Sequence, residues 1–274
     1  MSAWQPKLVA LDIDGTLLAW VDGDIENYEK ITPAVRSAVH AAVSAGAHVV
    51  LSSGRSPHGM EPIADLLGLP EAVQDRLWIV ASNGAVVFRY PPQEIVHEVT
   101  FDASAAVHEV LRHHPEALVA VEERGIGYRI NRPFPPGELN GEMIQADVHH
   151  MVSEPVSRVI IRDPSATAED FITLAENLGL HGTDYIVGWT AWMDLQPVGV
   201  SKAYGLQYVA DHLGIDPADA LAIGDGRNDQ EMLAWAGRGV AMGQAIDEVK
   251  QAADAVTDSV YDDGVAIELR RWFG

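Results

Sequence analysis

The sequence predicts an α/β protein with a doubly wound, Rossmann-like parallel-sheet core and an inserted α+β module. Strand-like and helix-like segments alternate from the start of the chain, a stretch with hairpin patterns interrupts them, and the alternation then resumes. Residues 7–13 (KLVALDI) form a near-continuous apolar run, which is typical of a parallel strand that is covered on both faces. These observations together favour one large domain that is interrupted by a second.

The first part of the core reads as three strands joined by two helices. A helix is expected over 32–46, because Thr32 is a candidate N-cap, Pro33 suits the first turn and Gly46 ends the pattern. The other expected elements are strands at 47–53 and 77–85 and a helix at 56–69. This βαβαβ order is typical of an open, doubly wound sheet.

The rhythm changes at about residue 86. Residues 86–99 read as a hairpin with a Pro-Pro turn, and a mixture of short strands and helices follows, including a helix over 166–180. The helix–strand alternation resumes near residue 200. We therefore assign 86–191 to the inserted module, and 1–85 together with 192–274 to the core.

Composition excludes several classes of function. The chain has 40 acidic and 18 basic residues, a net charge of −22, and no basic stripe, so binding to nucleic acid or to anionic membranes is not expected. Cysteine is absent, which removes disulfides, thiol nucleophiles and cysteine-ligated zinc. No secretion signal and no apolar run of ~18–20 residues is found, so a soluble, cytoplasmic protein is predicted.

Most of the polar residues that could carry chemistry follow the ends of predicted core strands. One of them, Lys202, lies near the start of the helix that precedes the strand ending at 224. The set consists of Asp12, Asp14, Ser53, Gly54, Lys202, Asp225, Asn228 and Asp229. In doubly wound sheets, ligands bind beyond the carboxyl ends of the strands. We therefore expect these side chains to converge on one crevice.

The carboxylates in this set predict a metal ion. Two unit charges ~6 Å apart repel by roughly 3 kcal/mol at an effective dielectric constant of ~20. Mg²⁺ would relieve this repulsion, because it takes oxygen ligands and readily shares a phosphate oxygen. The Ser53 hydroxyl and the Lys202 ammonium offer donors to an anion beside the metal. The combination predicts phosphoryl chemistry rather than redox or acyl-transfer chemistry.

Four motifs occur in the order seen in the haloacid dehalogenase-like phosphatases. They are DIDGTL (12–17), SSGR (52–55), the lone lysine in GVSKAYGL (199–206) and GDGRND (224–229). With ASNGA (81–85) and the insertion that follows it, the chain resembles the Cof-type branch, in which an α/β cap domain is inserted at this place. Ser53 stands where threonine is more usual, and it keeps the hydroxyl.

The resemblance implies a role for each motif residue. Asp12 would be the nucleophile that forms an aspartyl phosphate, and Asp14 would protonate the leaving alcohol and later deprotonate the water. The residues implied to hold phosphate oxygens are Ser53, Gly54, Lys202 and Asn228. Mg²⁺ would be bound by Asp12, the Asp14 main-chain carbonyl and Asp225, with Asp229 nearby either directly or through water.

The function predicted on this basis is a Mg²⁺-dependent phosphatase that hydrolyses a small phosphorylated metabolite, such as a sugar phosphate. Two alternatives stay open: a sugar phosphomutase with the same core, and a phospho-acceptor signalling domain. Arg55 adjoins the predicted phosphate loop, and the sequence leaves open whether it contacts phosphate, the cap or solvent. Neither the substrate nor an oligomeric state is predicted.

Overall fold

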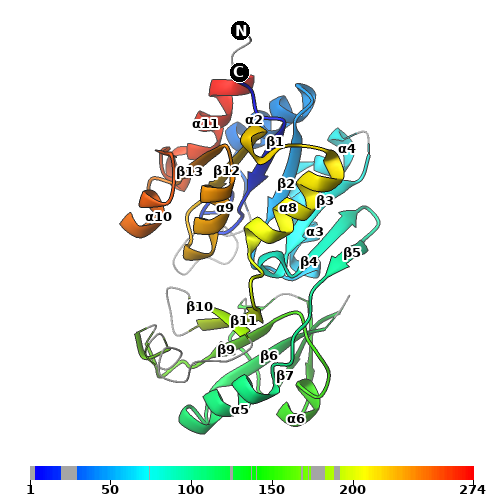
Figure 1. Cartoon of the computed structure of the whole chain (residues 1–274), viewed down its shortest axis with the longest axis vertical. Helices are drawn as coiled ribbons and strands as arrows, with labels where there is room; N and C mark the ends of the chain where they lie inside the picture. The colour runs from blue at the N-terminus through cyan, green and yellow to red at the C-terminus, as the bar shows by residue number, and fades with distance from the viewer. Residues whose placement is uncertain are drawn as a thin grey trace. The chain divides into compact units, whose positions relative to one another are not determined.

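The computed structural model divides the chain into two compact units (Figure 1). Unit 1 comprises Met1–Arg55, Met60–His97 and Ser201–Gly274, and unit 2 comprises Ser56–Gly59 and Glu98–Val200. The residues described are 4–19, 30–73, 75–123, 126–136, 138–139, 141–167, 169–171, 173, 183–187 (backbone alone) and 192–274. Among them, no helix combines the length and the hydropathy that crossing a bilayer requires.

Unit 1 is built on one mixed sheet. Its strands are β1 (Leu8–Leu11), β2 (His48–Ser52), β3 (Leu77–Ala81), β4 (Val86–Tyr90), β5 (Glu94–Glu98), β12 (Ala220–Gly224), β13 (Arg238–Ala241) and β14 (Ala255–Val256). They form an eight-stranded sheet in the order β14-β13-β12-β1-β2-β3-β4-β5. The six strands from β14 to β3 run parallel, and β4 pairs antiparallel with β3. The predicted α/β class is confirmed.

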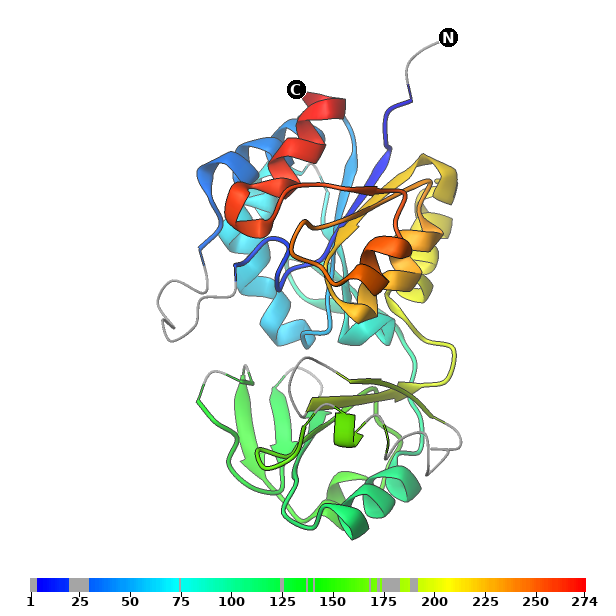
Figure 2. The ribbon, with the colours of Figure 1, turned by 90° about the vertical axis from the view of Figure 1, so that its left-hand side faces the viewer.

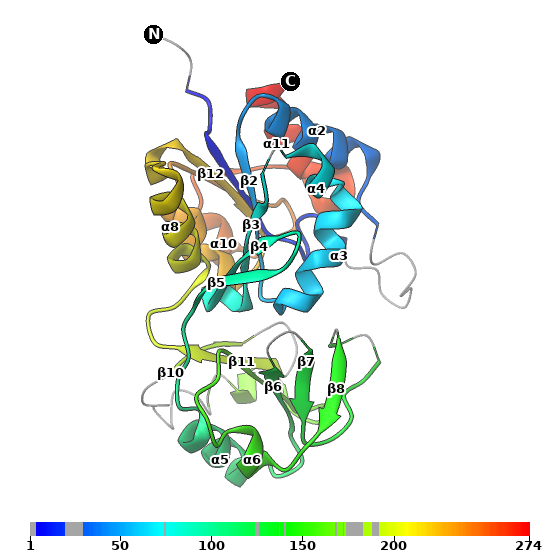
Figure 3. The same ribbon diagram turned by 90° about the vertical axis from the view of Figure 1, so that its right-hand side faces the viewer.

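Helices cover both faces of this sheet. They are α2 (Pro33–Ser44), α3 (Pro57–Leu67), α4 (Leu69–Ala72), α8 (Lys202–Leu213), α9 (Gln230–Trp235), α10 (Asp247–Gln251) and α11 (Gly264–Phe273). Val9 and Leu11 of β1 pack in one buried cluster with side chains of α2, α3 and α11, whereas Leu8 and Ala10 face a second cluster with α8, α9 and α10. Figure 2 and Figure 3 show α2 and α11 on one side of the sheet and α8 on the other.

Local capping explains where two of these helices begin. The Thr32 hydroxyl accepts a hydrogen bond from the Val35 amide at 3.2 Å, as an N-cap does, and Pro33 follows as the first helical residue. The helix predicted over 32–46 is therefore observed as α2. Ser201 caps α8 in the same way, by accepting from the Tyr204 amide, and Gly214 closes that helix in the left-handed conformation.

The first hairpin lies in unit 1, whereas the sequence placed it in the inserted module. β4 pairs with β3 from Ala81↔Val86 to Leu77↔Tyr90, and β5 extends the same sheet. Only residues 82–85 separate β3 from β4, so the chain turns back and pairs with the strand it has just left. The observed units change at 97/98 and 200/201, later than the predicted boundaries at 86 and 191.

Unit 2 is an α+β layer. Its elements are α5 (Ser104–His113), β6 (Leu118–Glu123), β7 (Gly127–Ile130), β8 (Glu142–Gln145), α6 (Val148–Met151), β9 (Val159–Arg162), β10 (Thr183–Val187) and β11 (Trp192–Pro197). The strands form a six-stranded sheet in the order β10-β11-β9-β6-β7-β8, and α5 and α6 contribute side chains to one buried cluster of this unit. Most of the helix predicted over 166–180 lies outside the described residues.

Candidate active site

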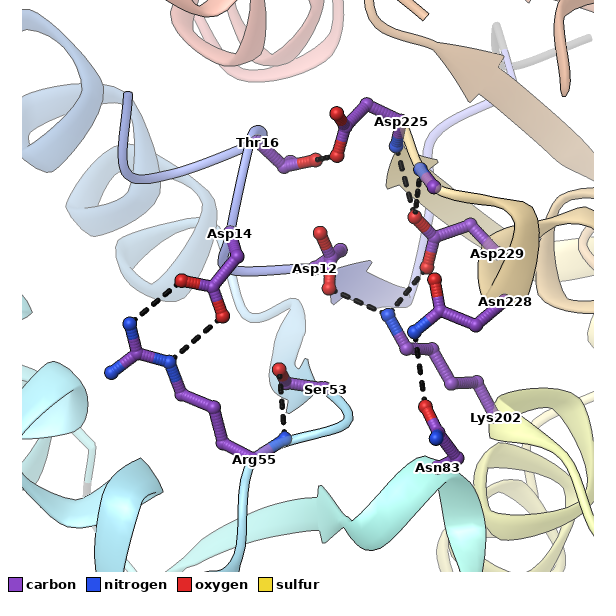
Figure 4. A network of polar contacts seen from close by, with 11 residues as sticks. Asp12, Asp14, Thr16, Ser53, Arg55, Asn83, Lys202, Asp225, Asn228 and Asp229 are labelled. Atoms are coloured by element: carbon purple, nitrogen blue, oxygen red, sulfur yellow. Dashed lines mark hydrogen bonds and ion pairs between the residues drawn. The ribbon is translucent and has the colours of Figure 1, made fainter. Parts of the chain in front are cut away.

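The strand order of unit 1 brings distant motifs together. β1 lies between β12 and β2, and Leu11 is in register with both Ile223 and Leu51. Asp12 follows β1, Ser53 follows β2 and Asp225 follows β12, so the three residues leave the same edge of the sheet side by side. Figure 4 shows their side chains around one centre, with Lys202 reaching in from the start of α8.

Lys202 is the central cation of this cluster. Its side chain is 1% exposed, and its Nζ donates to Asp12 Oδ1 and to Asp229 Oδ1, both at 2.6 Å. A buried ammonium is tolerated only when carboxylates and hydrogen bonds replace its water. Burial alone would lower the pKa of Lys202, but Asp12 and Asp229 together outweigh burial and raise the pKa above its usual value. Lys202 therefore stays charged.

Three buried carboxylates surround this one ammonium. Asp12, Asp225 and Asp229 each offer an oxygen within 4.8 Å of the others. Burial, followed by the charge of Asp229, raises the pKa of Asp12 well above its usual range, although Lys202 opposes this shift. Burial and Asp229 likewise raise the pKa of Asp225 to about 7. Three carboxylates share one ammonium, and the raised pKa values mean that full ionisation of the cluster is unfavourable, a condition that a bound cation would relieve.

The donor set fits a hard divalent cation. All three residues offer carboxylate oxygens, which lie within 4.8 Å of one another, and oxygen is the ligand that Mg²⁺ prefers. Asp229 is the most occupied of the three, because Oδ1 accepts from Lys202 and Oδ2 accepts from the amides of Asp225 and Gly226 at 2.9 and 2.8 Å. Asp12 and Asp225 are therefore better placed to bind an ion directly, and Asp229 to hold the loop that carries Asp225.

Asp14 points away from the three carboxylates and pairs with Arg55 (Figure 4). Arg55 donates from Nε to Asp14 Oδ2 at 2.8 Å and from Nη2 to Asp14 Oδ1 at 2.7 Å. Such a two-bond arginine–carboxylate pair is strong and holds both planes in fixed geometry. The sequence left Arg55 unassigned, and the structure makes it the partner of the predicted acid–base residue.

The predicted phosphate-binding residues Ser53 and Asn228 lie in the same cluster as Asp12 (Figure 4). Ser53 is buried, and its Oγ accepts from the Arg55 amide at 3.2 Å, a bond that leaves the hydroxyl proton for another acceptor. Asn228 donates from Nδ2 to Asn83 Oδ1 at 3.0 Å. Gly54 adjoins Asn83, since a Cβ at Gly54 would lie 3.0 Å from Asn83 Oδ1. Asn83 was not among the predicted site residues.

Comparison with known proteins identifies the family. A family model described as haloacid dehalogenase-like hydrolase matches residues 9–269. The chain belongs to this family. The predicted family is thereby confirmed, and with the phosphatase names of relatives such as those described next, so is the predicted enzyme class, a phosphoric monoester hydrolase.

Several relatives span this hydrolase almost completely. A phosphoglycolate phosphatase of Natronomonas pharaonis is 30% identical and covers 96% of each chain. A 5-amino-6-(5-phospho-D-ribitylamino)uracil phosphatase of Bacillus subtilis, YitU, is 29% identical and covers 98% of each chain. The solved structure of BT4131, a sugar phosphatase of subclass IIB of the family, matches with a TM-score of 0.81 at 22% identity, over 97% of this chain and 98% of the other. The last likeness shows a common fold.

A tight turn after Asp14 shapes the hydrolase's carboxylate cluster. Gly15 has φ +86°, and a Cβ there would overlap the Asp225 carboxylate. Thr16 Oγ1 donates to Asp225 Oδ1 at 3.4 Å, and Gln244 Nε2 donates to the Gly15 carbonyl at 2.5 Å and to Asp225 Oδ2 at 3.4 Å. Gln244 lies in no motif that the sequence singled out. The turn therefore depends on the absence of a side chain at residue 15.

Gly15→Ala is expected to destabilise the hydrolase more than Gly46→Ala. Gly46 also has positive φ, +92°, but nothing lies within 4 Å of its added Cβ. Gly46→Ala should cost about 1–2 kcal/mol for the left-handed backbone alone, whereas overlap with Asp225 should add roughly 1–3 kcal/mol to Gly15→Ala. Urea unfolding of both variants measures the difference. Equal losses would show that the contact with Asp225 is unimportant.

Proposed function

We propose that this hydrolase is a Mg²⁺-dependent phosphatase that cleaves a small phosphate monoester, a sugar phosphate or a related metabolite, through an aspartyl-phosphate intermediate. Unit 1 is the catalytic core in this proposal and unit 2 is the cap. The observation that carries the proposal is Asp12, a buried carboxylate directly after the central strand, held by Lys202 next to two further carboxylates. The phosphatase names of the two relatives, which both act on small phosphorylated compounds, support the substrate class.

Asp12 is the nucleophile in the proposed reaction. One of its carboxylate oxygens forms a bond to phosphorus while the ester P–O bond breaks. Lys202 Nζ donates to the Asp12 carboxylate at 2.6 Å, which restricts the orientation of that carboxylate. The Ser53 hydroxyl and the Asn228 amide donate hydrogen bonds to the phosphoryl oxygens in this proposal. Water then attacks the aspartyl phosphate, releases inorganic phosphate and regenerates the carboxylate.

Asp14 supplies and removes the protons. It protonates the leaving oxygen in the first step and takes a proton from water in the second. The two hydrogen bonds from Arg55 hold the Asp14 carboxylate in fixed geometry. For the first step Asp14 must carry a proton, so we propose that the pair with Arg55 opens when the ester binds.

Mg²⁺ would be held by Asp12, Asp225 and the main-chain carbonyl of Asp14, with Asp229 contributing through water. When bound, the ion offsets the negative charge that the phosphoryl oxygens share with the three carboxylates. The fit rests on the oxygen-only donor set and on the excess of carboxylates over lysine.

Addition of Mg²⁺ to metal-free protein is expected to raise the midpoint of thermal unfolding. Binding at 100 times the dissociation constant stabilises the folded state by about 2.7 kcal/mol. Asp225→Asn should reduce the shift strongly, because it removes a direct ligand. The control is Glu231→Gln, which removes an exposed carboxylate of α9 and should leave the shift unchanged. An equal shift in all three proteins would mean that Mg²⁺ acts elsewhere.

Two experiments test the reaction. Phosphorylated metabolites are offered with Mg²⁺, and released inorganic phosphate is measured; an isomerised sugar phosphate without release would instead indicate a phosphomutase. During turnover of a substrate found in this way, borohydride should reduce the aspartyl phosphate and convert Asp12 to homoserine, which mass spectrometry detects. Unmodified Asp12 at saturating substrate would contradict the covalent route.

Asp14→Asn is expected to lower turnover of an alkyl phosphate by about 10²–10⁴-fold, the usual contribution of a positioned acid or base. The loss in the first step should be smaller for an aryl phosphate, whose leaving group needs little protonation. Single-turnover kinetics with both esters separate the steps. An equal loss for both esters in the first step would remove Asp14 as the general acid.

A further inference from the structure

The turn formed by Ser82, Asn83 and Gly84 is strained and buried next to the active site. Ser82 and Asn83 have φ values of 51° and 52°, in the left-handed region that costs any residue with a Cβ conformational energy. Both side chains are almost fully buried, at 0% and 1% exposure. Strain of this kind persists only where the surroundings enforce it, and it gathers at functional sites.

Two active-site segments hold this turn. The Ser82 amide donates to the Arg55 carbonyl at 2.9 Å, and the Asn83 amide donates to the Ser53 carbonyl at 3.1 Å. On the other side, a Cβ at Gly84 would overlap the carbonyl of Ser201, the residue that caps α8. The turn is therefore wedged between the loop that carries Ser53 and the helix that carries Lys202.

The Asn83 side chain pairs with Asn228 through its carbonyl oxygen and does not use its amino group in this pair. Asn83 Oδ1 accepts from Asn228 Nδ2 at 3.0 Å, while the buried Asn83 Nδ2 has no hydrogen-bond partner among the residues that the structure describes. Rotating both amides exchanges the two roles, and one amino group still stays outside the pair. A buried donor without an acceptor is unfavourable, so an acceptor supplied by a ligand would complete the pair.

Lys202 and Arg55, the two basic side chains labelled in Figure 4, are already engaged by carboxylates. Lys202 donates to Asp12 and Asp229, and Arg55 donates to Asp14. A phosphoryl group brings three oxygens that need donors, so neutral donors beside Asp12 become important. The Ser53 hydroxyl is one, and the amino group left over from the Asn83–Asn228 pair is another.

We propose that Asn83 is a phosphate-positioning residue: it fixes the Asn228 amide against the Ser53–Gly54 loop, and the amino group that the pair does not use donates to a phosphoryl oxygen. This inference rests on the proposed phosphatase function and adds a residue to its phosphate site. The competing explanation is conformational, since Asn tolerates positive φ better than most residues. The two explanations predict opposite results for glycine.

Asn83→Gly separates the explanations, because glycine adopts positive φ without strain but has no amide. The binding of inorganic phosphate in the presence of Mg²⁺ is measured by calorimetry, beside thermal unfolding. We expect Asn83→Gly to unfold at or above the wild-type temperature and to bind phosphate at least about tenfold more weakly. Asn83→Asp should bind more weakly still, because its carboxylate repels phosphate. Ser82→Gly relieves strain in the same turn without touching the amide pair, and it should bind as wild type does.

A double-mutant cycle with Asn228→Ala shows whether the two amides act together. If they form one unit, the double variant Asn83→Gly/Asn228→Ala binds phosphate about as weakly as Asn228→Ala alone. Strictly additive losses would overturn the proposal. So would wild-type affinity in Asn83→Gly, or a wild-type protein that does not bind phosphate with Mg²⁺.

The phosphate-binding experiment does not depend on whether the protein hydrolyses an ester. If no phosphate ester is hydrolysed, the proposed function fails, while phosphate binding still reports on Asn83. If esters are hydrolysed and Asn83→Gly keeps wild-type phosphate affinity, only the role of Asn83 is lost.

Discussion

Asp12→Asn is expected to reduce phosphate release by at least about 10⁴-fold, because a neutral amide cannot replace the attacking carboxylate. The same substitution should leave folding intact or make the metal-free protein more stable. Burial and Asp229 raise the pKa of Asp12, which means that its negative charge is unfavourable in the folded state. Steady-state kinetics and thermal unfolding of the same preparation measure both effects.

The combination of lost activity and retained stability distinguishes a nucleophile from a structural residue. Lys202 still has Asp229 as a partner at 2.6 Å in Asp12→Asn, so no buried ammonium is left alone. A protein that unfolds at a much lower temperature would assign Asp12 a structural role. Turnover within tenfold of wild type would remove Asp12 as the nucleophile.

Lys202→Met is expected to lower the free energy of unfolding by about 3–5 kcal/mol, the usual effect of removing one partner of a buried ion pair. Methionine fills a similar volume but leaves Asp12 and Asp229 buried without their ammonium. Urea unfolding of metal-free protein measures the loss. Adding Asp229→Asn should recover part of it, because one of the two uncompensated charges is then gone.

The matched control is Lys7→Met. Lys7 Nζ lies 2.7 Å from Asp219 Oδ2, nearly the same distance as in the Lys202 pairs, but the two side chains are 66% and 31% exposed. Such a surface pair contributes about 0–1 kcal/mol. Similar losses for Lys202→Met and Lys7→Met would show that burial does not set the importance of the Lys202 cluster.

Much of the candidate site could be predicted from the sequence, because the physics of parallel sheets is regular. Apolar runs identified the strands, and residues that follow neighbouring parallel strands must leave the sheet at one edge. Asp12, Ser53 and Asp225 are brought together in this way, and the lysine at the start of α8 joins them. The short-range capping signal at Thr32 was equally informative, since a cap involves only neighbouring residues.

The hairpin of β4 and β5 shows what such patterns do not predict. Alternating apolar residues predict that a strand exists, but they do not state which sheet it joins. The four residues between β3 and β4 set the pairing, and β5 then extended the core sheet rather than the sheet of unit 2. A boundary drawn where the rhythm changes therefore falls too early in the chain.

The sequence by itself determined the fold class, the family and the set of carboxylates, hydroxyl and lysine at one sheet edge. Only the tertiary structure decided that Arg55 holds Asp14, that Asn83 pairs with Asn228 and that Gln244 braces the turn at Gly15. The physical reason is the separation along the chain of the residues that interact. The existence of strands and the capping of helices follow from local patterns, whereas these contacts join side chains from separate segments, and their directions depend on how the whole core packs.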